Sequence, residues 1–387
     1  MTFIILVSSC CSDPQGKETD VTPGAYQTRE YIPYLSNKRI GVVVNQTSMI
    51  ENVHLVDTLI SSGINVVKIF SPEHGFKGDK SDGEIIEDEN SEEYNIPVIS
   101  LYGNDKMLNA HDVRDIDIMV FDIQDVGVRF YTYISTLHYV LEGCAQNNIP
   151  VLVLDRPNPN RQYIDGPVLK KEFSSFIGMH PVPVVYGMTI GEYAGMINGE
   201  LWLKDSLQCK LEIVKCENYD HSSYYDLPVN PSPNLRNITA IYLYPSLAFF
   251  EGTVVSVGRG TKFPFLVIGH PDYTDTTFSF IPQSDPEASL HPKLKGQKCY
   301  GINLQGINAD SLRCNGRIEL SYLISFYNDL NLGDEFFTDY FTLLAGNNEL
   351  SNQIIEGKTA EEIKESWQKD LEKYKIIRAK YLLYPDF

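Results

Sequence analysis

Short apolar segments rich in β-branched residues alternate with helix-like segments through the first half of the chain, and this alternation constrains the fold most strongly. The segments predicted as strands are residues 40–45, 64–70, 96–101, 116–122, 149–154 and 211–214. Apolar residues at helical spacing lie between them, in residues 53–60, 131–145 and 189–203. Strands that alternate with helices are typical of βαβ units. We therefore predict an α/β domain built on a mostly parallel sheet.

The pattern changes after a proline-rich segment, residues 228–233, which is typical of a domain junction. Beyond it we predict an α+β arrangement, with strands at 253–257 and 265–268 and helices at 320–330 and 359–381. A chain of 387 residues is long enough for two domains. The predicted parts are a signal and tether at 1–24, an α/β domain at 25–235 and a smaller α+β domain at 236–387.

The balance of charged residues argues against two classes of partner. The chain has 32 Lys and Arg residues against 51 Asp and Glu residues, a net charge of −19. Binding to duplex nucleic acid depends on cationic contacts to phosphate, and docking to an anionic membrane needs a basic patch. The sequence also has no GxGxxG motif after its first predicted strand and no P-loop motif. We therefore predict no nucleic-acid partner and no cofactor.

The first residues resemble an export signal. Residues 3–7 are apolar, and Ser8, Ser9 and Cys10 follow them, which is the order found in bacterial lipoprotein signals. The apolar segment is too short to span a bilayer, and residues 12–24 are typical of a flexible tether. We predict an exported protein, periplasmic or surface-bound, with a lipid on Cys10. An ordinary N-terminus is the alternative.

The positions of the cysteines and aspartates bear on two questions, disulfide formation and metal binding. In an exported protein Cys299 and Cys314 could form a disulfide, but sequence does not fix the connectivity. No CxxC pair occurs, so zinc binding through cysteine is disfavoured. Asp122, Asp125 and Asp155 could bind a cation through oxygen, yet their spacing is not diagnostic, and we predict no metal site.

Polar residues follow the predicted strands at their carboxyl ends. In an open α/β sheet these ends form one rim, and ligands bind there. The polar residues are Asn45, Glu73, His74, Asp122, Asp125 and residues 155–158. Glu73 and His74 stand in residues 71–76, Ser-Pro-Glu-His-Gly-Phe, a loop bounded by proline and glycine. We therefore predict acid–base chemistry at this rim. The alternative is that Glu73 caps the next segment and His74 is an ordinary loop residue.

Several sequence motifs occur in one order along the chain. They are Asn-Gln-Thr-Ser at 45–48, Ser-Pro-Glu-His-Gly-Phe at 71–76, Asp-Ile-Gln-Asp-Val-Gly-Val-Arg-Phe-Tyr-Thr-Tyr at 122–133, Asp-Arg-Pro-Asn-Pro at 155–159, Tyr-Gly-Met-Thr-Ile-Gly-Glu at 186–192, Pro-Ser-Pro-Asn at 231–234, and the segments 249–253 and 252–261. From about residue 41 to its C-terminus, the chain thereby resembles the NamZ-type exo-β-N-acetylmuramidases. The resemblance implies a Rossmann-like N-terminal domain, a smaller C-terminal domain and an active-site cleft between them. It also implies release of N-acetylmuramic acid (MurNAc) from the non-reducing ends of peptidoglycan fragments that contain MurNAc-β-1,4-GlcNAc.

Hydrolysis of a glycoside usually needs two carboxyl groups that flank the scissile bond. We predict Glu73 as the general acid, because it lies at a strand end in a tight loop. Its partner is Glu251, which follows two phenylalanines in an apolar setting that would favour a protonated carboxyl group, or Asp125. The alternatives are a structural ion pair between Glu251 and Arg259, and a loop hydrogen bond for Asp125. A retaining, an inverting and a substrate-assisted mechanism all stay open.

The remaining candidates are residues suited to binding the sugar. MurNAc carries a lactyl carboxylate, and arginine binds carboxylates through two parallel hydrogen bonds. The candidates for this contact are Arg129, Arg156 and Arg259; the alternative for Arg129 is a buried pair with Asp122 or Asp125. The candidates for hydroxyl and acetamido contacts are Asn45, Gln124, Asn158 and His74, which could instead position Glu73. Tyr131 or Tyr133 could stack on the sugar ring, and core packing is the alternative for both.

Two other functions remain as alternatives. A non-catalytic lipoprotein that binds muropeptides would use the same cleft without a carboxyl pair. A different hydrolase, such as an esterase or amidase, is disfavoured because the chain lacks the GxSxG motif of α/β serine hydrolases. The predicted partners are therefore peptidoglycan-derived disaccharides and muropeptides. The oligomeric state is left open.

Overall fold

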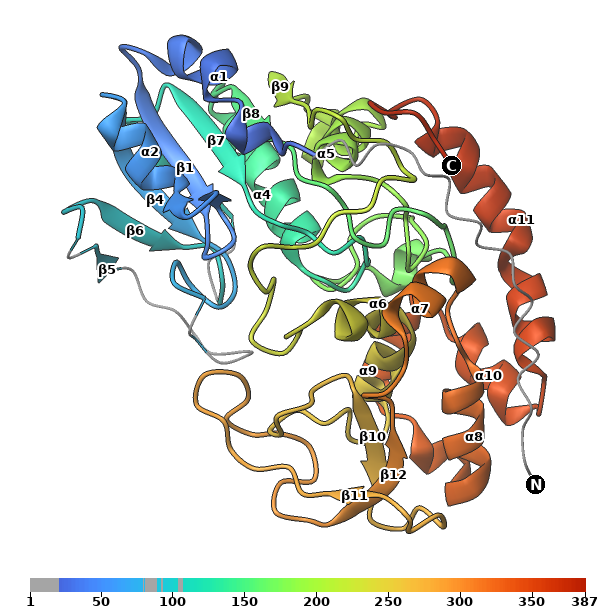
Figure 1. Ribbon diagram of the computed structural model, residues 1–387. Helices are drawn as coiled ribbons and strands as arrows, with labels where there is room; N and C mark the ends of the chain where they lie inside the picture. Colours follow the sequence, from blue (N-terminus) through green and yellow to red (C-terminus); the bar gives the residue numbers. More distant parts are fainter. Residues whose placement is uncertain (1–20, 79, 81–88, 92, 104–106) are drawn as a thin grey trace.

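A seven-stranded sheet organises the first region of the computed structural model, which describes residues 21–387 except 79, 81–88, 92 and 104–106. The strands lie in the order β5-β6-β4-β1-β7-β8-β9 (Figure 1). Their bounds are β1 Arg39–Val44, β4 Asn65–Ser71, β5 Glu89–Asn90, β6 Pro97–Ser100, β7 Ile118–Asp122, β8 Val151–Leu154 and β9 Leu211–Val214. All neighbours pair in parallel except β5, which is antiparallel to β6. Counted along the chain, the parallel strands follow the 3-2-1-4-5-6 order of a Rossmann fold.

Alternate residues of the strands face opposite sides of the sheet, so a hydrophobic cluster forms on each face. In β1, Ile40 and Val42 belong to the cluster that contains residues of α1 and α2, whereas Val43 belongs to the cluster that contains residues of α4 and α5. The helices of this region are α1 Thr28–Leu35, α2 Leu55–Ser61, α3 Ala110–Val113, α4 Tyr133–Gln146 and α5 Ile190–Gly199. Strands buried on both faces read as continuous apolar runs, which is why the sequence revealed them. The prediction of an α/β fold on a mostly parallel sheet is confirmed.

A smaller antiparallel sheet and several helices form the C-terminal region, in the lower part of Figure 1. The sheet has the order β10-β12-β11, with bounds β10 Val267–His270, β11 Ser279–Phe280 and β12 Cys299–Asn303. The helices are α6 Ile238–Leu247, α7 Ala309–Asn315, α8 Ser321–Leu330, α9 Asp339–Ala345, α10 Glu349–Ile355 and α11 Ala360–Arg378. The region therefore has the predicted α+β character. Shorter elements are β2 Met49–Ile50, β3 Val53–His54 and the 3-10 turns η1 Gly24–Tyr26, η2 Lys171–Phe173, η3 Lys204–Ser206, η4 Ala248–Gly252 and η5 Gly333–Phe336.

The last helix and the C-terminal tail pack on the first region. Figure 1 shows α11 running along the side of the molecule from the C-terminal region toward α5. In α11 the Tyr374 hydroxyl donates to the carbonyl oxygen of Tyr186 at 2.8 Å, and beyond it the Tyr384 hydroxyl donates to the Asp155 carboxylate at 2.5 Å. The hydrophobic cluster around α4 and α5 also includes residues of α11. The two regions thus share one core, and the domain boundary at residues 235 and 236 stays a prediction.

A buried ion pair closes the carboxyl end of β7. Arg156 donates from Nε to Asp122 Oδ1 at 2.5 Å and from Nη2 to Asp122 Oδ2 at 2.9 Å. The side chains of Arg156 and Asp122 are only 1% and 0% exposed. At the opposite end of the sheet, Arg39 forms the same kind of bidentate ion pair with Asp117, but these side chains are 45% and 41% exposed. The two pairs therefore differ mainly in burial.

Three expectations from the sequence differ from the structure. Residues 253–257 form only isolated bridges and no strand, because a 3-10 turn, η4, leads directly into them. Residues 53 and 54 form β3, and α2 begins after them. Cys299, buried in β12, is a free thiol, so the disulfide with Cys314 of α7 that was considered above does not form.

The predicted signal segment, including Cys10, lies outside the described residues. Of the predicted tether, residues 21–24 are described, and they are fixed to the fold. The Thr22 N–H donates to the carbonyl oxygen of Glu217 at 2.9 Å, and the Gly24 N–H donates to that of Asp155 at 2.7 Å. None of the helices in the described part of the chain is long and apolar enough to cross a membrane.

Candidate active site

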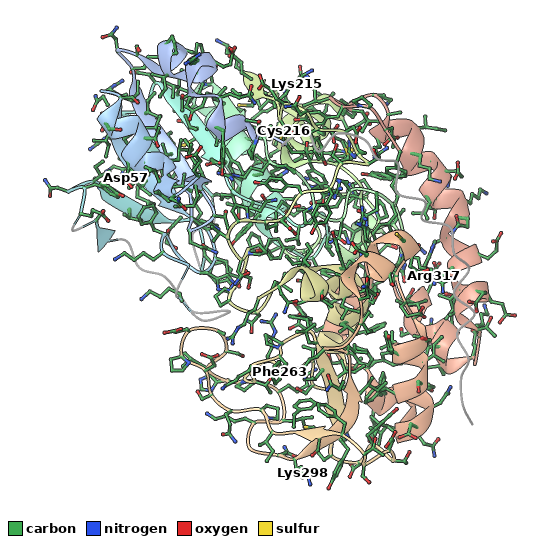
Figure 2. All side chains as sticks on the ribbon, viewed as in Figure 1. Asp57, Lys215, Cys216, Phe263, Lys298 and Arg317 are labelled. Atoms are coloured by element: carbon green, nitrogen blue, oxygen red, sulfur yellow. The ribbon has the colours of Figure 1, made fainter. Side chains whose placement is uncertain are left out.

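A cavity of about 400 Å³ is lined by residues of both regions. The polar side chains on its wall include Glu73, His74, Thr132, Ser232, Glu251, Arg259 and Lys293. Glu73 and His74 follow β4, and Thr132 immediately precedes α4, so this side of the cavity is built from the carboxyl ends of the large sheet. The other side comes largely from the C-terminal region, the part of Figure 2 in which Phe263 and Lys298 are labelled. This is the place where ligands bind in open α/β sheets.

A sharp turn after β4 places Glu73. The Gly75 N–H donates to the carbonyl oxygen of Pro72 at 3.0 Å, which closes the turn. His74 has a φ of 71° and Gly75 a φ of 76°. The left-handed region is uncommon for a residue with a Cβ, and it clusters at ligand sites. The turn thus holds Glu73 and His74 side by side on the cavity wall.

Thr132, the N-cap residue of α4, holds the Glu73 side chain. Its Oγ1 lies 3.0 Å from Glu73 Oε2. A hydroxyl group can donate or accept a hydrogen bond, so this contact suits a carboxylate and a protonated carboxyl group alike. Thr132 therefore fixes the direction of Glu73 in both protonation states.

We expect Thr132→Val to lower kcat about 10-fold, the equivalent of about 1.4 kcal/mol, with little change in KM. Valine keeps the shape of threonine but removes the hydrogen bond that orients Glu73. The control is Thr136→Val, one helical turn further on, where the hydroxyl bonds only to the carbonyl oxygen of Thr132, at 3.4 Å. Equal kcat values for the two variants would show that Thr132 does not orient the acid.

His74 and Ser232 form a second polar pair on the wall. His74 Nδ1 lies 2.8 Å from the carbonyl oxygen of Lys80, which can only accept, so Nδ1 carries a proton. His74 Nε2 faces Ser232 Oγ at 3.5 Å. Both side chains line the cavity, and His74 is thus oriented to offer Nε2 toward a ligand hydroxyl.

Glu251 lies in an ion pair rather than in an apolar setting. Arg259 Nε donates to Glu251 Oε1 at 2.6 Å, and the guanidinium lies over the Phe265 ring, 5.1 Å from its centre. The preceding Phe249 and Phe250 are fully buried and pack into the core. The ion pair that the sequence left as an alternative is therefore present, and both of its members line the cavity.

Tyr131 contributes an aromatic wall. Its hydroxyl donates to the carbonyl oxygen of Pro231 at 2.6 Å. Its ring packs edge-on against Tyr133 at 4.8 Å and against Tyr244 at 6.1 Å, and all three rings line the cavity. The aromatic cluster fixes the shape of the cavity and offers an apolar surface to a sugar ring.

Family models match nearly the whole described chain. The model "Exo-beta-N-acetylmuramidase NamZ, N-terminal" matches residues 40–239, and the model "Exo-beta-N-acetylmuramidase NamZ, C-terminal" matches residues 242–384. The chain belongs to the NamZ exo-β-N-acetylmuramidase family. A peptidoglycan β-N-acetylmuramidase NamZ of Bacillus subtilis (strain 168) is 37% identical over 374 residues, which cover 92% of this chain and 89% of the relative.

Two solved structures share the NamZ-family fold of this chain. Both are crystal structures of DUF1343 family proteins from Bacteroides fragilis NCTC 9343. One is 45% identical with a TM-score of 0.86, and covers 95% of this chain and 100% of its own. The other is 25% identical with a TM-score of 0.78, and covers 94% of this chain and 99% of its own. The two-region arrangement is therefore shared with experimentally determined structures.

Six residues that the sequence proposed for the NamZ-family site do not line the cavity: Asn45, Gln124, Asp125, Arg129, Arg156 and Asn158. All are buried, and each makes at least one side-chain hydrogen bond within the protein. Asn45 Nδ2, for example, donates to the Tyr133 hydroxyl at 2.9 Å. Gln124 Nε2 donates to the carbonyl oxygen of Pro157 at 2.7 Å, and Asn158 Nδ2 to that of Met188 at 2.8 Å. We do not carry these six into the proposed mechanism.

Arg129 pairs with neither Asp122 nor Asp125, contrary to the alternative considered from the sequence. Its Nη1 and Nη2 atoms donate to the carbonyl oxygens of Pro167, Val182, Leu344 and Ala345 at 2.7–2.8 Å. Burial lowers the pKa of Arg129 to about 9. The arginine that pairs with Asp122 is instead Arg156. Arg129 thus joins the end of α9 to the first region.

Asp125, the rival to Glu251, is enclosed. It accepts hydrogen bonds from the Tyr186 hydroxyl and, at 2.6 Å, from the Gly127 N–H, as the loop alternative predicted. Burial raises the pKa of Asp125 to about 6, although these hydrogen bonds oppose the shift. A raised pKa alone would make Asp125 attractive as an acid, but Asp125 does not line the cavity, whereas Glu251 does, so Glu251 is the better-placed partner for Glu73.

Some cavity residues of this NamZ-family chain were not proposed from the sequence. Ser232 lies in the Pro-Ser-Pro-Asn motif, which was interpreted as a family motif beside a domain junction and was given no role in the site. Thr132 lies between Tyr131 and Tyr133, and only the two tyrosines were proposed as site residues. Lys293 lies outside every motif named in the sequence. Among the described residues, no group of three or more His, Cys, Asp or Glu side chains is placed to hold a metal ion.

Proposed function

We propose that this chain is an exo-acting glycoside hydrolase that releases MurNAc from the non-reducing ends of peptidoglycan fragments containing MurNAc-β-1,4-GlcNAc. The observation that supports this most is the joint presence of Glu73 and Glu251, from opposite regions, on the wall of one cavity in a NamZ-family chain. A volume of about 400 Å³ suits a small ligand. The Bacillus subtilis relative is named a peptidoglycan β-N-acetylmuramidase.

In this proposal Glu73 is the general acid that protonates the glycosidic oxygen as the bond to the anomeric carbon breaks. Glu251, paired with Arg259, supplies the second carboxylate, which faces the positive charge that develops at the anomeric carbon. Thr132 keeps Glu73 oriented, and His74 offers a hydrogen bond to a sugar hydroxyl.

Arg259 is the proposed partner of the lactyl carboxylate. Of the three arginines considered from the sequence, it is the one on the cavity wall. A guanidinium group has five N–H donors, so Arg259 can keep its Nε contact to Glu251 and still direct other donors to a ligand carboxylate. A GlcNAc unit in the same position has no carboxylate and would lose this contact.

The test compares two chromogenic substrates with the purified wild-type protein. We expect release of p-nitrophenol from p-nitrophenyl-β-MurNAc but not from p-nitrophenyl-β-GlcNAc, and release of free MurNAc from the disaccharide MurNAc-GlcNAc. Saturable binding of the disaccharide without any turnover would support the alternative, a muropeptide-binding protein. Turnover of both aryl glycosides at similar rates would contradict the selectivity for MurNAc.

We further propose that the protein is exported and carries a lipid on Cys10, as the order of residues 3–10 suggests. Such an anchor would place the enzyme near cell-wall fragments. Metabolic labelling with palmitate should mark the wild-type protein in a bacterial host and should not mark Cys10→Ser. Labelling of neither protein would contradict the anchor and leave the proposed activity unaffected.

A further inference from the structure

Lys293 lies on the cavity wall, yet its charged group binds the protein backbone. Its Nζ donates to the carbonyl oxygens of Phe250 at 3.0 Å and of Glu251 at 3.1 Å, and also to the carbonyl oxygen of Thr253. An ammonium group has three N–H donors. All three have acceptors within residues 250–253, and this short segment carries Glu251.

The segment is the end of the 3-10 turn η4. Carbonyl groups at the C-terminal end of a helical turn can accept further hydrogen bonds, and aligned peptide dipoles favour a cation at that end. Lys293 supplies the cation from a loop more than 40 positions along the chain from Phe250. The side chain therefore caps η4 in the way that a charged residue at the end of a helix does.

The loop that carries Lys293 is packed on the loop that carries Arg259. The Gln283 N–H donates to the carbonyl oxygen of Gly260 at 2.8 Å. A Cβ added at Gly260, whose φ is 74°, would lie 2.5 Å from Cγ of Pro292. The two loops are thus in direct contact at Gly260, between the residue that binds the Glu251 carboxylate, Arg259, and the loop that carries Lys293.

We propose that Lys293 is a positioning residue for the hydrolysis, which holds the backbone of residues 250–253 so that the Glu251 carboxylate stays in the cavity beside Arg259. Its three N–H groups bind carbonyl oxygens, so in this proposal Lys293 acts through Glu251 and does not itself bind the sugar. The kinetic consequence rests on the proposed function, whereas the effect on residues 250–253 does not.

The capping contact depends on the charge of Lys293. Burial lowers the pKa of Lys293 to about 8; Glu251 opposes this shift and Arg259 adds to it. The Lys293 charge also acts on His270, whose pKa is lowered mainly by burial; Asp272 opposes this shift and Lys293 adds to it. Above about pH 8 the amine becomes neutral, and its two N–H groups no longer serve three carbonyl oxygens. The hold on Glu251 should therefore weaken as the pH rises through this value.

The kinetic test uses Lys293→Met, Lys293→Arg and, as a control, Lys295→Met, which removes an exposed lysine from the same loop. We expect Lys293→Met to lower kcat about 10- to 100-fold on MurNAc-GlcNAc, because small shifts of a catalytic group cost that much, with KM nearly unchanged. In Lys293→Arg, kcat should fall less at high pH than it does in the wild type, since arginine keeps its charge.

The pH profile separates positioning from a general loss of folding. Wild-type kcat should fall above about pH 8, whereas kcat of Lys293→Met should be low and should lack that alkaline decline. The proposal would be overturned if kcat declined at the same alkaline pH in wild type and in Lys293→Met. It would also be overturned if the kcat of Lys293→Met equalled that of the wild type.

A readout without turnover keeps the inference testable if the enzyme proves inactive. Hydrogen–deuterium exchange at pH 7 should be faster in Lys293→Met for the peptide that spans residues 248–255, where the Thr253 N–H donates to the carbonyl oxygen of Phe250 at 3.0 Å. Exchange in β1 should be unchanged. Unchanged exchange at 248–255 would overturn the positioning role, while absent wild-type turnover with faster exchange would overturn the proposed function alone.

Discussion

Replacing Glu73 by Gln should lower kcat on MurNAc-GlcNAc by about 10²- to 10⁴-fold, the range that general acid catalysis contributes. Glutamine has the size of glutamate and keeps the contact to the Thr132 hydroxyl, so binding of the sugar and KM should change little. It has no acidic proton, so the leaving GlcNAc oxygen departs unprotonated. The measurement is release of MurNAc by wild type and variant at several substrate concentrations.

The matched control is Glu361→Gln, which makes the same change on the exposed first turn of α11 and should leave kcat unaltered. Full activity of Glu73→Gln would move the acid to another carboxyl group. Glu251→Gln tests whether Glu251 is the second carboxylate. A large loss of kcat in this variant would support the Glu73–Glu251 pair, whereas an unchanged kcat would remove Glu251 from the mechanism.

The largest loss of stability is expected from Asp122→Asn. This change leaves the Arg156 guanidinium buried at the end of β7 without its counter-charge. Breaking a buried ion pair by removing one partner costs about 3–5 kcal/mol, because the remaining charge is desolvated and uncompensated. Urea denaturation followed by circular dichroism should therefore show a clearly lower midpoint and an unchanged slope.

Asp117→Asn is the control for this prediction, because Asp117 binds Arg39 with the same two-pronged geometry at the surface. The pKa of Asp117 is lowered to about 2 by its hydrogen bonds with Arg39, yet solvent screens this pair. We expect a much smaller change in the urea midpoint. Equal shifts in the two variants would mean that burial does not determine the contribution of these pairs.

The sheet could be predicted from the sequence because burial on both faces leaves continuous apolar runs, which are hard to mistake. Residues 253–257 show the limit of this signal. They are equally rich in β-branched residues, but they follow η4 and form irregular chain with isolated bridges. Whether such a segment becomes a strand depends on its tertiary contacts.

The candidate site was predictable only in part, since the rim of the sheet identifies where polar residues gather but not which of them face a ligand. Glu73 and Arg156 both follow strands of the same sheet. Glu73 reaches the cavity, whereas Arg156 turns inward to Asp122. Lys293 was not predictable at all, because its partners are backbone carbonyl groups, and these leave no trace in the sequence.

The packing of the C-terminal tail on the large sheet has a consequence for synthesis on the ribosome. Asp155 and Glu192 are fully buried, and part of their hydrogen bonding comes from Tyr384 and from the backbone N–H of Leu383, at 2.5 Å and 2.8 Å. A nascent chain that has already exposed every strand of the sheet still lacks these donors. Native folding of the first region therefore finishes only after Leu383 and Tyr384 have left the exit tunnel.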